Sequence, residues 1–538
     1  MSETGQTPAL VRTRLSVMMF LQYAIWGAWL PLLWPVLNGH RGFNPGQIGD
    51  MFAVGAVGAL VAPFVAGQIA DRLFATEKFL GISHILGGIV VFVLASTEGY
   101  WAFLGLSLLY SLIYSPTLSL TNSISFHHLP DRDRDFGKVR VWGTVGWICV
   151  GIGIGQWLLM TSTPTKNDAA RAALVAHLDT AEERAELLAP LPPTAEDETT
   201  ETPPLRWWDL AASEETRPAV RALIDGLGEN ATRAEVEAAV DQLSDAEAVV
   251  SVKLIEDQTL SVQQAGMINA FRLSAILGIV MGLFCFTLPH TPPSKGREKN
   301  AAFEAIGEVL RSRPLMVLFL LLVPVSCIHQ FYFVHTSGFL GTYQTKAAES
   351  INAIFGVGGG GLMTIGQMSE ILVLALMPLL LKKVGHKTLL AIGLVAYALR
   401  MALFAYVDQI TASTGIPAIA VLITGVTMHG LCFGCFIFVS FVVVDKFTSK
   451  DVRASAQSLF SLVIFGIGII VGSKIAGMVA EIATKNKELD YQTLFAVPMW
   501  GAIGCLVALL LFYPRRDLKA AKEGVYLPDE PDPDRTQA

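Results

Sequence analysis

The chain has 538 residues, of which 52% are hydrophobic and only 16% are charged. A soluble domain carries about 25% charged residues, so the composition excludes an ordinary soluble protein and indicates an integral membrane protein. The formal net charge is −7, and no basic patch interleaved with aromatic residues supports nucleic-acid binding.

Twelve apolar segments are long enough to cross a bilayer, since a helical span needs about 20 mostly apolar residues. In the first half of the chain they are Leu15–Leu37, Met51–Ala70, Phe79–Ser96, Trp101–Ser125, Val139–Met160 and Met267–Leu288. In the second half they are Pro314–Leu340, Ile354–Leu381, Thr388–Val407, Ile416–Val444, Ala454–Glu481 and Leu494–Phe512. The first segment exceeds the length of a signal-peptide core, about 7–15 residues, so we expect it to be a span.

This spacing predicts an all-α membrane protein with two six-helix bundles. Residues 1–160 and 265–290 form the N-terminal bundle, and residues 314–514 form the C-terminal bundle. Between spans five and six lies a polar insert, residues 161–264, and between the bundles lies a basic linker, residues 291–313. Residues 515–538 follow the last span as a polar tail.

Lysine and arginine gather in alternate loops, and such loops face the cytoplasm. We therefore expect an inner-membrane protein whose N and C termini, linker and tail are cytoplasmic and whose insert is periplasmic or extracellular. The residues concerned are Arg12, Arg14, Arg72, Lys78, Arg132, Arg134, Lys138, Lys295, Arg297, Lys299, Arg311, Arg313, Lys382, Lys383, Lys387, Lys446, Lys450, Arg453, Arg515 and Arg516.

The insert contains three sequences in which Ser or Thr precedes Glu by three residues, a pattern that caps helix N-termini. They are Thr180–Glu183, Thr232–Glu235 and Ser244–Glu247. Alanine-rich stretches follow them and favour short helices. Two interpretations of the insert stay open: a solvated decoration without a role in transport, or a lid or docking module.

Glu370 lies within the apolar run Gly360–Leu381 with no other ionisable side chain in that run. A carboxylate at bilayer depth costs several kcal/mol, so such residues usually face a protein interior or a watery cavity. Gln367 precedes it by three residues and shares its helix face. The pair indicates a polar substrate site with a titratable group; the alternative is a structural ion pair or a hydrogen bond between helices.

Cys432 and Cys435 form a C-x-x-C sequence inside an apolar segment. A metal or redox site would need a second pair or a soluble βαβ setting. Helix packing is therefore the favoured interpretation, and we expect no metal and no cofactor.

The sequence Gly67-Gln-Ile-Ala-Asp71-Arg72 after the second span resembles the loop signature of the major facilitator superfamily. Glycine permits close helix approach, and the aspartate can cap a helix or pair at a gate. Further local motifs are similar to those of the bacterial nucleoside:proton symporter family of that superfamily. They are Leu21–Leu30, Tyr114–Leu118, Arg140–Trp147, Thr287–Thr291, Gln367–Glu370, Leu399–Tyr406 and Arg453–Gln457.

The resemblance implies a set of binding residues in four spans. In the fifth span it implies Arg140, Thr144 and Trp147, which fall at helical spacing on one stripe. Taken alone, Arg140 could instead anchor the helix at the membrane surface, and Trp147 could serve packing. In the eighth span the resemblance implies Gln367 and Glu370, with Glu370 also the proton-coupling residue.

In the seventh and tenth spans the chain departs from the family pattern. Gln330 and Phe433 match family ligands, but Phe333 replaces an asparagine and His429 replaces a tyrosine. Gly434 stands where the family has an aspartate linked to proton coupling. His429 is interpreted either as a helix-packing donor or as a group that contacts substrate or proton.

The resemblance implies a carrier that takes up nucleosides with protons by alternating access, with the substrate bound between the bundles near the midplane. The implied partners are a nucleoside, protons and the lipid bilayer, and the implied state is a monomer without enzymatic activity. The alternatives are a proton-coupled carrier for a sugar or nucleobase derivative and, from another class, a membrane sensor that works through the insert.

Overall fold

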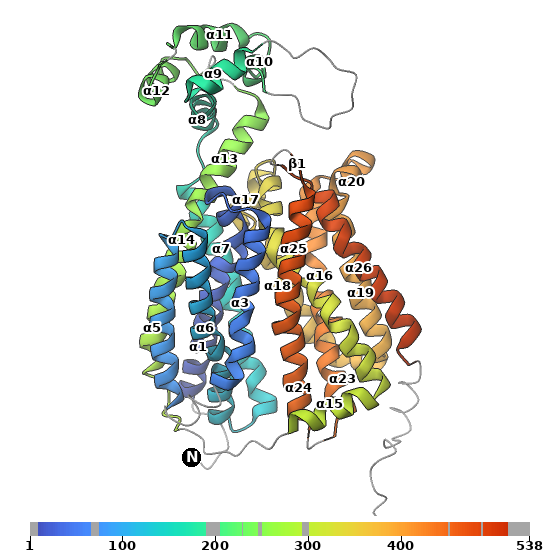
Figure 1. Ribbon diagram of the computed structural model, residues 1–538. Coiled ribbons are helices and arrows are strands. Elements are labelled where there is room, and N and C mark those ends of the chain that lie inside the picture. Colours follow the sequence, from blue (N-terminus) through green and yellow to red (C-terminus); the bar gives the residue numbers. More distant parts are fainter. Residues whose placement is uncertain are drawn as a thin grey trace, which may run out of the picture.

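The computed structural model describes residues 9–65, 75–189, 205–228, 230–245, 250–292, 301–449, 452–485 and 488–514. Twelve helices in this part of the chain are long and apolar enough to cross a membrane, as the sequence predicts. They form two bundles, and a group of shorter helices from the insert lies beyond one end of the N-terminal bundle (Figure 1).

The N-terminal bundle is built around α1, which packs against α7 and α14, while α3 and α5 pack against α6. Its elements are α1 (Ala9–Trp29), η1 (Leu30–Leu32), α2 (Leu33–Pro35), η2 (Val36–His40), α3 (Pro45–Val65), α5 (Thr76–Ala95), α6 (Tyr100–His128), α7 (Arg132–Thr161) and α14 (Ile268–Cys285). The predicted sixth span lies on α14, and α13 of the insert runs almost directly into it, so that one nearly continuous helix covers Val252–Cys285.

The C-terminal bundle places α16 against α25 and α26, and α19 against α26 and the π-helical turn η4. Its elements are α16 (Arg313–Gln344), α17 (Glu349–Phe355), α18 (Gly360–Lys383), α19 (His386–Ala405), α20 (Val407–Thr414), α21 (Ala418–Thr427), α22 (His429–Leu431), η4 (Cys432–Phe438), α23 (Val439–Phe447), α24 (Arg453–Ser461), η5 (Leu462–Ile467), α25 (Gly468–Ala483), β1 (Thr484–Lys485), β2 (Glu488–Leu489) and α26 (Tyr491–Phe512). The linker helix α15 (Ala301–Arg311) lies under this bundle (Figure 1).

The insert folds into a helical unit with its own apolar core. Its helices are α8 (Lys166–Leu178), α9 (Ala181–Leu188), α10 (Trp207–Leu210), α11 (Arg217–Gly226), α12 (Arg233–Asp241) and α13 (Val252–Gly266). Side chains such as Leu174, Leu210, Val220 and Val236 are fully buried in a cluster separate from the bundles. The insert is therefore a folded unit rather than a string of isolated solvated helices.

Two of the three predicted capping boxes are present in the insert. Thr180 and Glu183 cap α9 reciprocally, and Thr232 and Glu235 do the same for α12. The third prediction involves Glu247, which lies outside the described residues. Hydrogen bonds from the Thr232 backbone and hydroxyl lower the pKa of Glu235. The cap therefore stabilises the fold when the pH is above the ordinary pKa of glutamate, and this stabilisation is lost as the pH falls through the lowered pKa.

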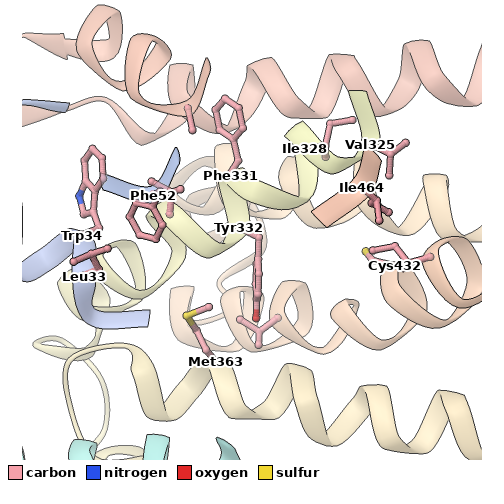
Figure 2. Close-up of a cluster of buried hydrophobic side chains, with 14 of the residues drawn as sticks. Leu33, Trp34, Phe52, Val325, Ile328, Phe331, Tyr332, Met363, Cys432 and Ile464 are labelled. Carbon is pink, nitrogen blue, oxygen red and sulfur yellow. The ribbon is translucent and has the colours of Figure 1, made fainter. Parts of the chain in front are cut away.

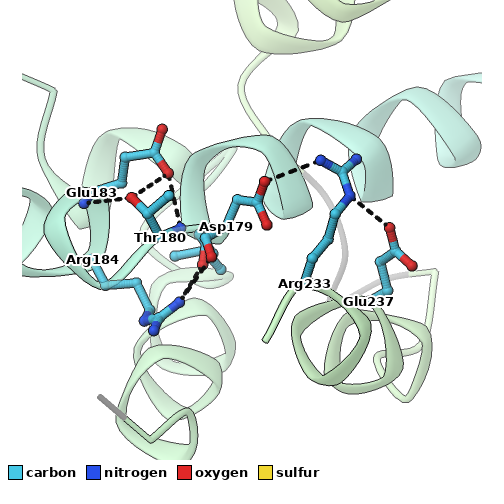
Figure 3. A network of polar contacts seen from close by, with 7 residues as sticks. Asp179, Thr180, Glu183, Arg184, Arg233 and Glu237 are labelled. Atoms are coloured by element: carbon cyan, nitrogen blue, oxygen red, sulfur yellow. Dashed lines mark hydrogen bonds and ion pairs between the residues drawn. The ribbon is translucent and has the colours of Figure 1, made fainter. Parts of the chain in front are cut away.

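Arg233 joins two helices of the insert. Its guanidinium contacts Asp179 at 3.0 Å, just after α8, and Glu237 at 3.0 Å within α12 (Figure 3). Both pairs lie at the surface, where solvent screening leaves such ion pairs with little effect on stability. The apolar core, rather than these ion pairs, therefore holds the insert together.

The two bundles meet on the side from which the insert emerges. A Cβ atom on Gly49 of α3 would lie 2.8 Å from the Ser473 carbonyl oxygen of α25, so the absence of a side chain permits this approach. Near the end of α7, the Gly155 carbonyl accepts a backbone hydrogen bond from Val357 at 3.0 Å. Asp50 and Lys474 also form an ion pair across the bundles.

Apolar side chains seal the same region. Leu33, Trp34 and Phe52 of the N-terminal bundle belong to the same buried apolar cluster as Phe331 of α16 and Met363 of α18 (Figure 2). The glycine run before α18 supports this packing: Gly356, Gly358 and Gly359 have positive φ angles of 70°, 86° and 80°. Residues with side chains rarely adopt this conformation.

Candidate functional site

The face of α18 that carries Gln367 and Glu370 points into the protein. A Cβ atom on the neighbouring Gly366 would lie 3.0 Å from both the His429 Cβ and the Tyr332 hydroxyl, so α18 packs tightly on α22 and α16 there. Gln367 is 6% exposed, and its Oε1 atom has no hydrogen-bond partner among the residues that the structure describes. A buried acceptor without a partner costs about 1–3 kcal/mol, which makes this amide suited to a polar ligand.

The imidazole of His429 lies between two charged groups. Its Nε2 atom is 3.6 Å from Glu370 Oε2, and its Nδ1 atom is 3.1 Å from Arg400 Nη1. The Glu370 side chain is 18% exposed, whereas that of His429 is 2% exposed. The structure thus brings together the predicted residues Gln367, Glu370 and His429, and adds Arg400 to them.

Arg400 of α19 is a site residue that the sequence analysis missed. Its side chain is fully buried, and its guanidinium carbon lies 4.3 Å from the centre of the Tyr332 ring and 5.1 Å from that of Tyr397. Such contacts stabilise a desolvated cation by up to about 2 kcal/mol. The signal was present in the sequence, because Arg400 is the only charged side chain within the predicted span Thr388–Val407.

His329 completes this cluster from α16. Its Nδ1 atom lies 2.7 Å from the Tyr397 hydroxyl, and its ring stacks on that of His429 at 5.4 Å. His335, two turns further along, does not join it: its Nε2 atom lies 3.2 Å from the Ala476 carbonyl, and its ring packs against Trp34. Of these two histidines of α16, His329 therefore belongs to the site and His335 to the contact with α25.

The other predicted residues of the C-terminal bundle surround the cluster. Phe333 is half-buried, with its ring 5.1 Å from His329 and 6.1 Å from His429. Phe433 is also half-buried, on the first turn of η4. Gln330 is 5% exposed, and its Cβ atom lies against Gly472 of α25.

Gly434 has no room for a side chain. A Cβ atom there would lie 2.6 Å from Val373 Cγ1 and 3.4 Å from Met377 Cε of α18. An aspartate at this position would therefore have to displace the Val373 side chain. The glycine thus permits the close approach of η4 to α18 that the structure shows.

The predicted residues Arg140 and Trp147 of α7 pack on α1 of their own bundle. The Arg140 guanidinium lies 4.1 Å from the centre of the Tyr23 ring. Trp147 packs on Gly27, with its ring 6.3 Å from Trp26. Arg140, Thr144 and Trp147 are all partly exposed, so each retains surface that a ligand could contact.

The two bundles meet near this cluster. α7 of the N-terminal bundle packs against α18 of the C-terminal bundle, and a Cβ atom on Gly151 of α7 would lie 2.8 Å from Thr364 Cγ2 of α18. The helix that carries Arg140 is thus in direct contact with the helix that carries Glu370.

The remaining candidates are three loop residues that cannot be placed and the two cysteines of the C-x-x-C sequence. The loop residues Gly67, Asp71 and Arg72 lie outside the described residues. Cys432 and Cys435 are both free and buried, and no group of three or more potential metal ligands is found in the part of the chain that is described.

The sequence matches the family described as nucleoside H⁺ symporter over residues 10–176 and 249–517, which is more than half of the chain and omits most of the insert. YegT of Escherichia coli (strain K12) is 26% identical over 505 residues, covering 93% of this chain and 92% of YegT. The nucleoside permease NupG of the same organism is 23% identical over 495 residues, covering 90% and 92%.

The fold is similar to that of a solved transporter. The crystal structure of the nucleoside transporter NupG superposes with a TM-score of 0.66 and 21% sequence identity, covering 94% of this chain and all of that one. At this level of identity, the similarity establishes the fold of the two bundles.

Proposed function

Because the chain belongs to the nucleoside H⁺ symporter family, it is a proton-coupled nucleoside transporter, and we propose that the cluster around Gln367 and Glu370 is where it binds nucleoside and proton. The observation that carries this proposal is the unpartnered, buried Oε1 atom of Gln367 one helical turn from Glu370. Gln367 supplies one polar group, and Glu370 supplies a titratable one, on the same face of α18.

The chemistry of a nucleoside fits the surrounding residues. A nucleobase presents donors and acceptors at its edge and a flat face for stacking. The amide of Gln367 can pair with such an edge, while the partly exposed rings of Phe333 and Phe433 offer stacking surfaces. On the opposite wall, Arg140, Thr144 and Trp147 supply a cation, a hydroxyl and a third ring.

Transport follows from movement of one bundle against the other around a central site. The contacts Gly49–Gly477, Gly155–Val357 and Asp50–Lys474 all lie on the insert side. We infer that they form the closed gate on that side and that they separate when the site opens toward the insert.

The orientation in the membrane is part of the proposal. The basic loops indicate cytoplasmic termini and an outer insert, so the closed gate faces outward. The test uses a cysteine-free variant and an impermeant thiol reagent, applied to cells with a permeabilised outer membrane. A cysteine that replaces Glu182 of α9 should react, whereas a cysteine that replaces Lys138 of α7 should not. The reverse pattern would overturn the orientation.

The substrate assignment is tested by competition in proteoliposomes. Uptake of one labelled nucleoside is measured with a panel of unlabelled nucleosides, nucleobases and sugars, with and without a protonophore. Competition by nucleosides and loss of accumulation with the protonophore support the proposal. Competition only by sugars or free bases would replace the substrate class while leaving the fold and the family unchanged. The carrier is proposed to work as a monomer, so activity should scale linearly with protein density.

A further inference from the structure

The contact between Arg400 and His429 fixes the protonation pattern of the imidazole. An arginine side chain can only donate hydrogen bonds, so the His429 Nδ1 atom that lies 3.1 Å from Arg400 Nη1 must accept. A neutral imidazole carries its one proton on the other nitrogen when Nδ1 accepts. His429 is therefore the Nε2–H tautomer.

This tautomer directs a donor at Glu370. The Nε2 atom lies 3.6 Å from Glu370 Oε2, slightly longer than an ordinary hydrogen bond of about 2.7–3.2 Å. The ring is held by stacking, with the Tyr332 ring at 4.8 Å and an interplanar angle of 22°. The His329 ring stacks at 5.4 Å and 28°. A small movement of α18 against α22 would close the contact.

Arg400 has no carboxylate of its own. Among the described residues it forms no ion pair, and its Nε and Nη2 atoms are buried without hydrogen-bond partners. A buried charge without compensation is strongly unfavourable. The faces of Tyr332 and Tyr397 provide part of that compensation, and the Glu370 carboxylate provides charge of opposite sign through the bridging imidazole.

The titratable and charged groups near the bridge come from every element packed around it. They are His329 and Tyr332 from α16, Glu370 from α18, Tyr397 and Arg400 from α19, His429 from α22, Cys432 from η4 and Arg140 from α7. Glu370 is the one carboxylate among them. A proton added at His429 Nδ1 would displace the Arg400 hydrogen bond and place two cations side by side.

We propose that Arg400 is a positioning residue for proton coupling: it fixes His429 as the Nε2–H tautomer, so that His429 is a permanent donor to Glu370 and Glu370 alone carries the proton. This inference rests on the proposed function of Glu370. Arg400, His429 and Glu370 then form one series of contacts that joins α19, α22 and α18. In this series the imidazole orients the carboxylate and does not itself titrate during transport.

Substitution of His429 separates the two possible proton carriers. Glutamine cannot titrate but offers an amide donor toward Glu370 and an oxygen that can accept from Arg400. His429→Gln should retain nucleoside accumulation driven by a pH gradient, at a reduced rate, whereas His429→Leu, which has neither group, should lose it. If His429→Gln abolishes gradient-driven accumulation while nucleoside exchange remains, His429 carries the proton and the inference is wrong.

The tautomer is measured directly on the full chain in lipid nanodiscs with ¹⁵N-labelled histidine. The chain has ten histidines, and His429→Gln identifies the two signals that belong to His429. In the wild type we expect an unprotonated Nδ1 and a protonated Nε2. Arg400→Met should shift the population toward the other tautomer, and Arg400→Lys should keep the Nε2–H tautomer. A protonated Nδ1 in the wild type would overturn the inference.

A failure of this inference can be distinguished from a failure of the proposed function. The spectrum of His429 needs no substrate, so it tests the role of Arg400 even if nucleosides are not transported. Absence of any nucleoside accumulation by the wild-type protein would instead reject the proposed function. Should Arg400→Met fail to fold, the wild-type spectrum and the comparison of His429→Gln with His429→Leu still decide the inference.

Discussion

Glu370 Oε2 lies 3.6 Å from His429 Nε2, and this contact joins the eighth span to the tenth. The carboxylate is partly exposed at 18%, whereas the imidazole is buried behind it at 2%. Glu370 is thus the member of the pair that a ligand or proton can approach.

Gln367→Ala should weaken nucleoside binding by about 1–3 kcal/mol, because the ligand group that pairs with the amide would be left unsatisfied in a buried site. Equilibrium binding of a labelled nucleoside to purified protein measures the change. Met368→Ala, on the adjacent exposed position, is the control and should leave the affinity unchanged. Equal affinities of Gln367→Ala and wild type would remove Gln367 from the binding site.

Gly434→Ala should destabilise the C-terminal bundle by about 1–3 kcal/mol, the usual effect of an added methyl group in a packed interior. The new Cβ would lie 2.6 Å from Val373 Cγ1. Thermal unfolding in detergent measures the effect, and Val373→Ala in the same chain should recover part of the loss.

The matched control for Gly434 is Gly504→Ala in α26, where no atom outside the local helix lies within 4 Å of the added Cβ. Alanine is the better helix former, so this variant should be neutral or slightly stabilised. Equal changes in unfolding temperature for the two variants would show that Gly434 is not packed as described.

Removal of the insert should leave transport intact. Residues 165–259 would be replaced by a short Gly/Ser linker, which is geometrically feasible because the end of α13 meets the segment after α7, where Gln263 Nε2 donates a hydrogen bond to the Thr163 hydroxyl at 3.2 Å. The insert has its own core, so its loss should not expose the core of the bundles. Uptake per molecule at the cell surface is the readout, and its loss at normal surface levels would identify the insert as a working part of the carrier.

Reversal of the charge at Lys474 should weaken the gate on the insert side. Lys474→Glu would oppose Asp50, which also accepts a hydrogen bond from the Tyr100 hydroxyl at 2.7 Å. Since partly exposed pairs contribute about 0.2–1 kcal/mol, the transport rate should fall only severalfold. The exchanged pair Asp50→Lys with Lys474→Glu should restore it. A double variant no better than the single one would show that the ion pair does not act in the gate.

The sequence predicts the bundle architecture because spans are set by apolar length, which is a local property. The number of spans and the capped helices α9 and α12 follow from such local patterns. The core of the insert does not, because it depends on contacts among six helices that the capping motifs do not specify.

The site is only partly predictable for a related reason. Glu370 and Gln367 stand out because they are polar residues in an apolar run. Arg400 satisfies the same criterion, but its role depends on the position of His429 in another helix. The consequence of Gly434 depends likewise on Val373, a residue that no motif indicates.

Glu370 is proposed to be the group through which the proton gradient drives uptake, and Glu370→Gln tests this most directly. Glutamine preserves the size and the hydrogen bonding of the side chain but cannot titrate. In proteoliposomes with an imposed inward proton gradient, the wild type should concentrate a labelled nucleoside, and the protonophore should abolish that accumulation. Glu370→Gln should not concentrate it, while exchange of internal for external nucleoside continues. Accumulation of several-fold by Glu370→Gln under the same gradient would contradict the account.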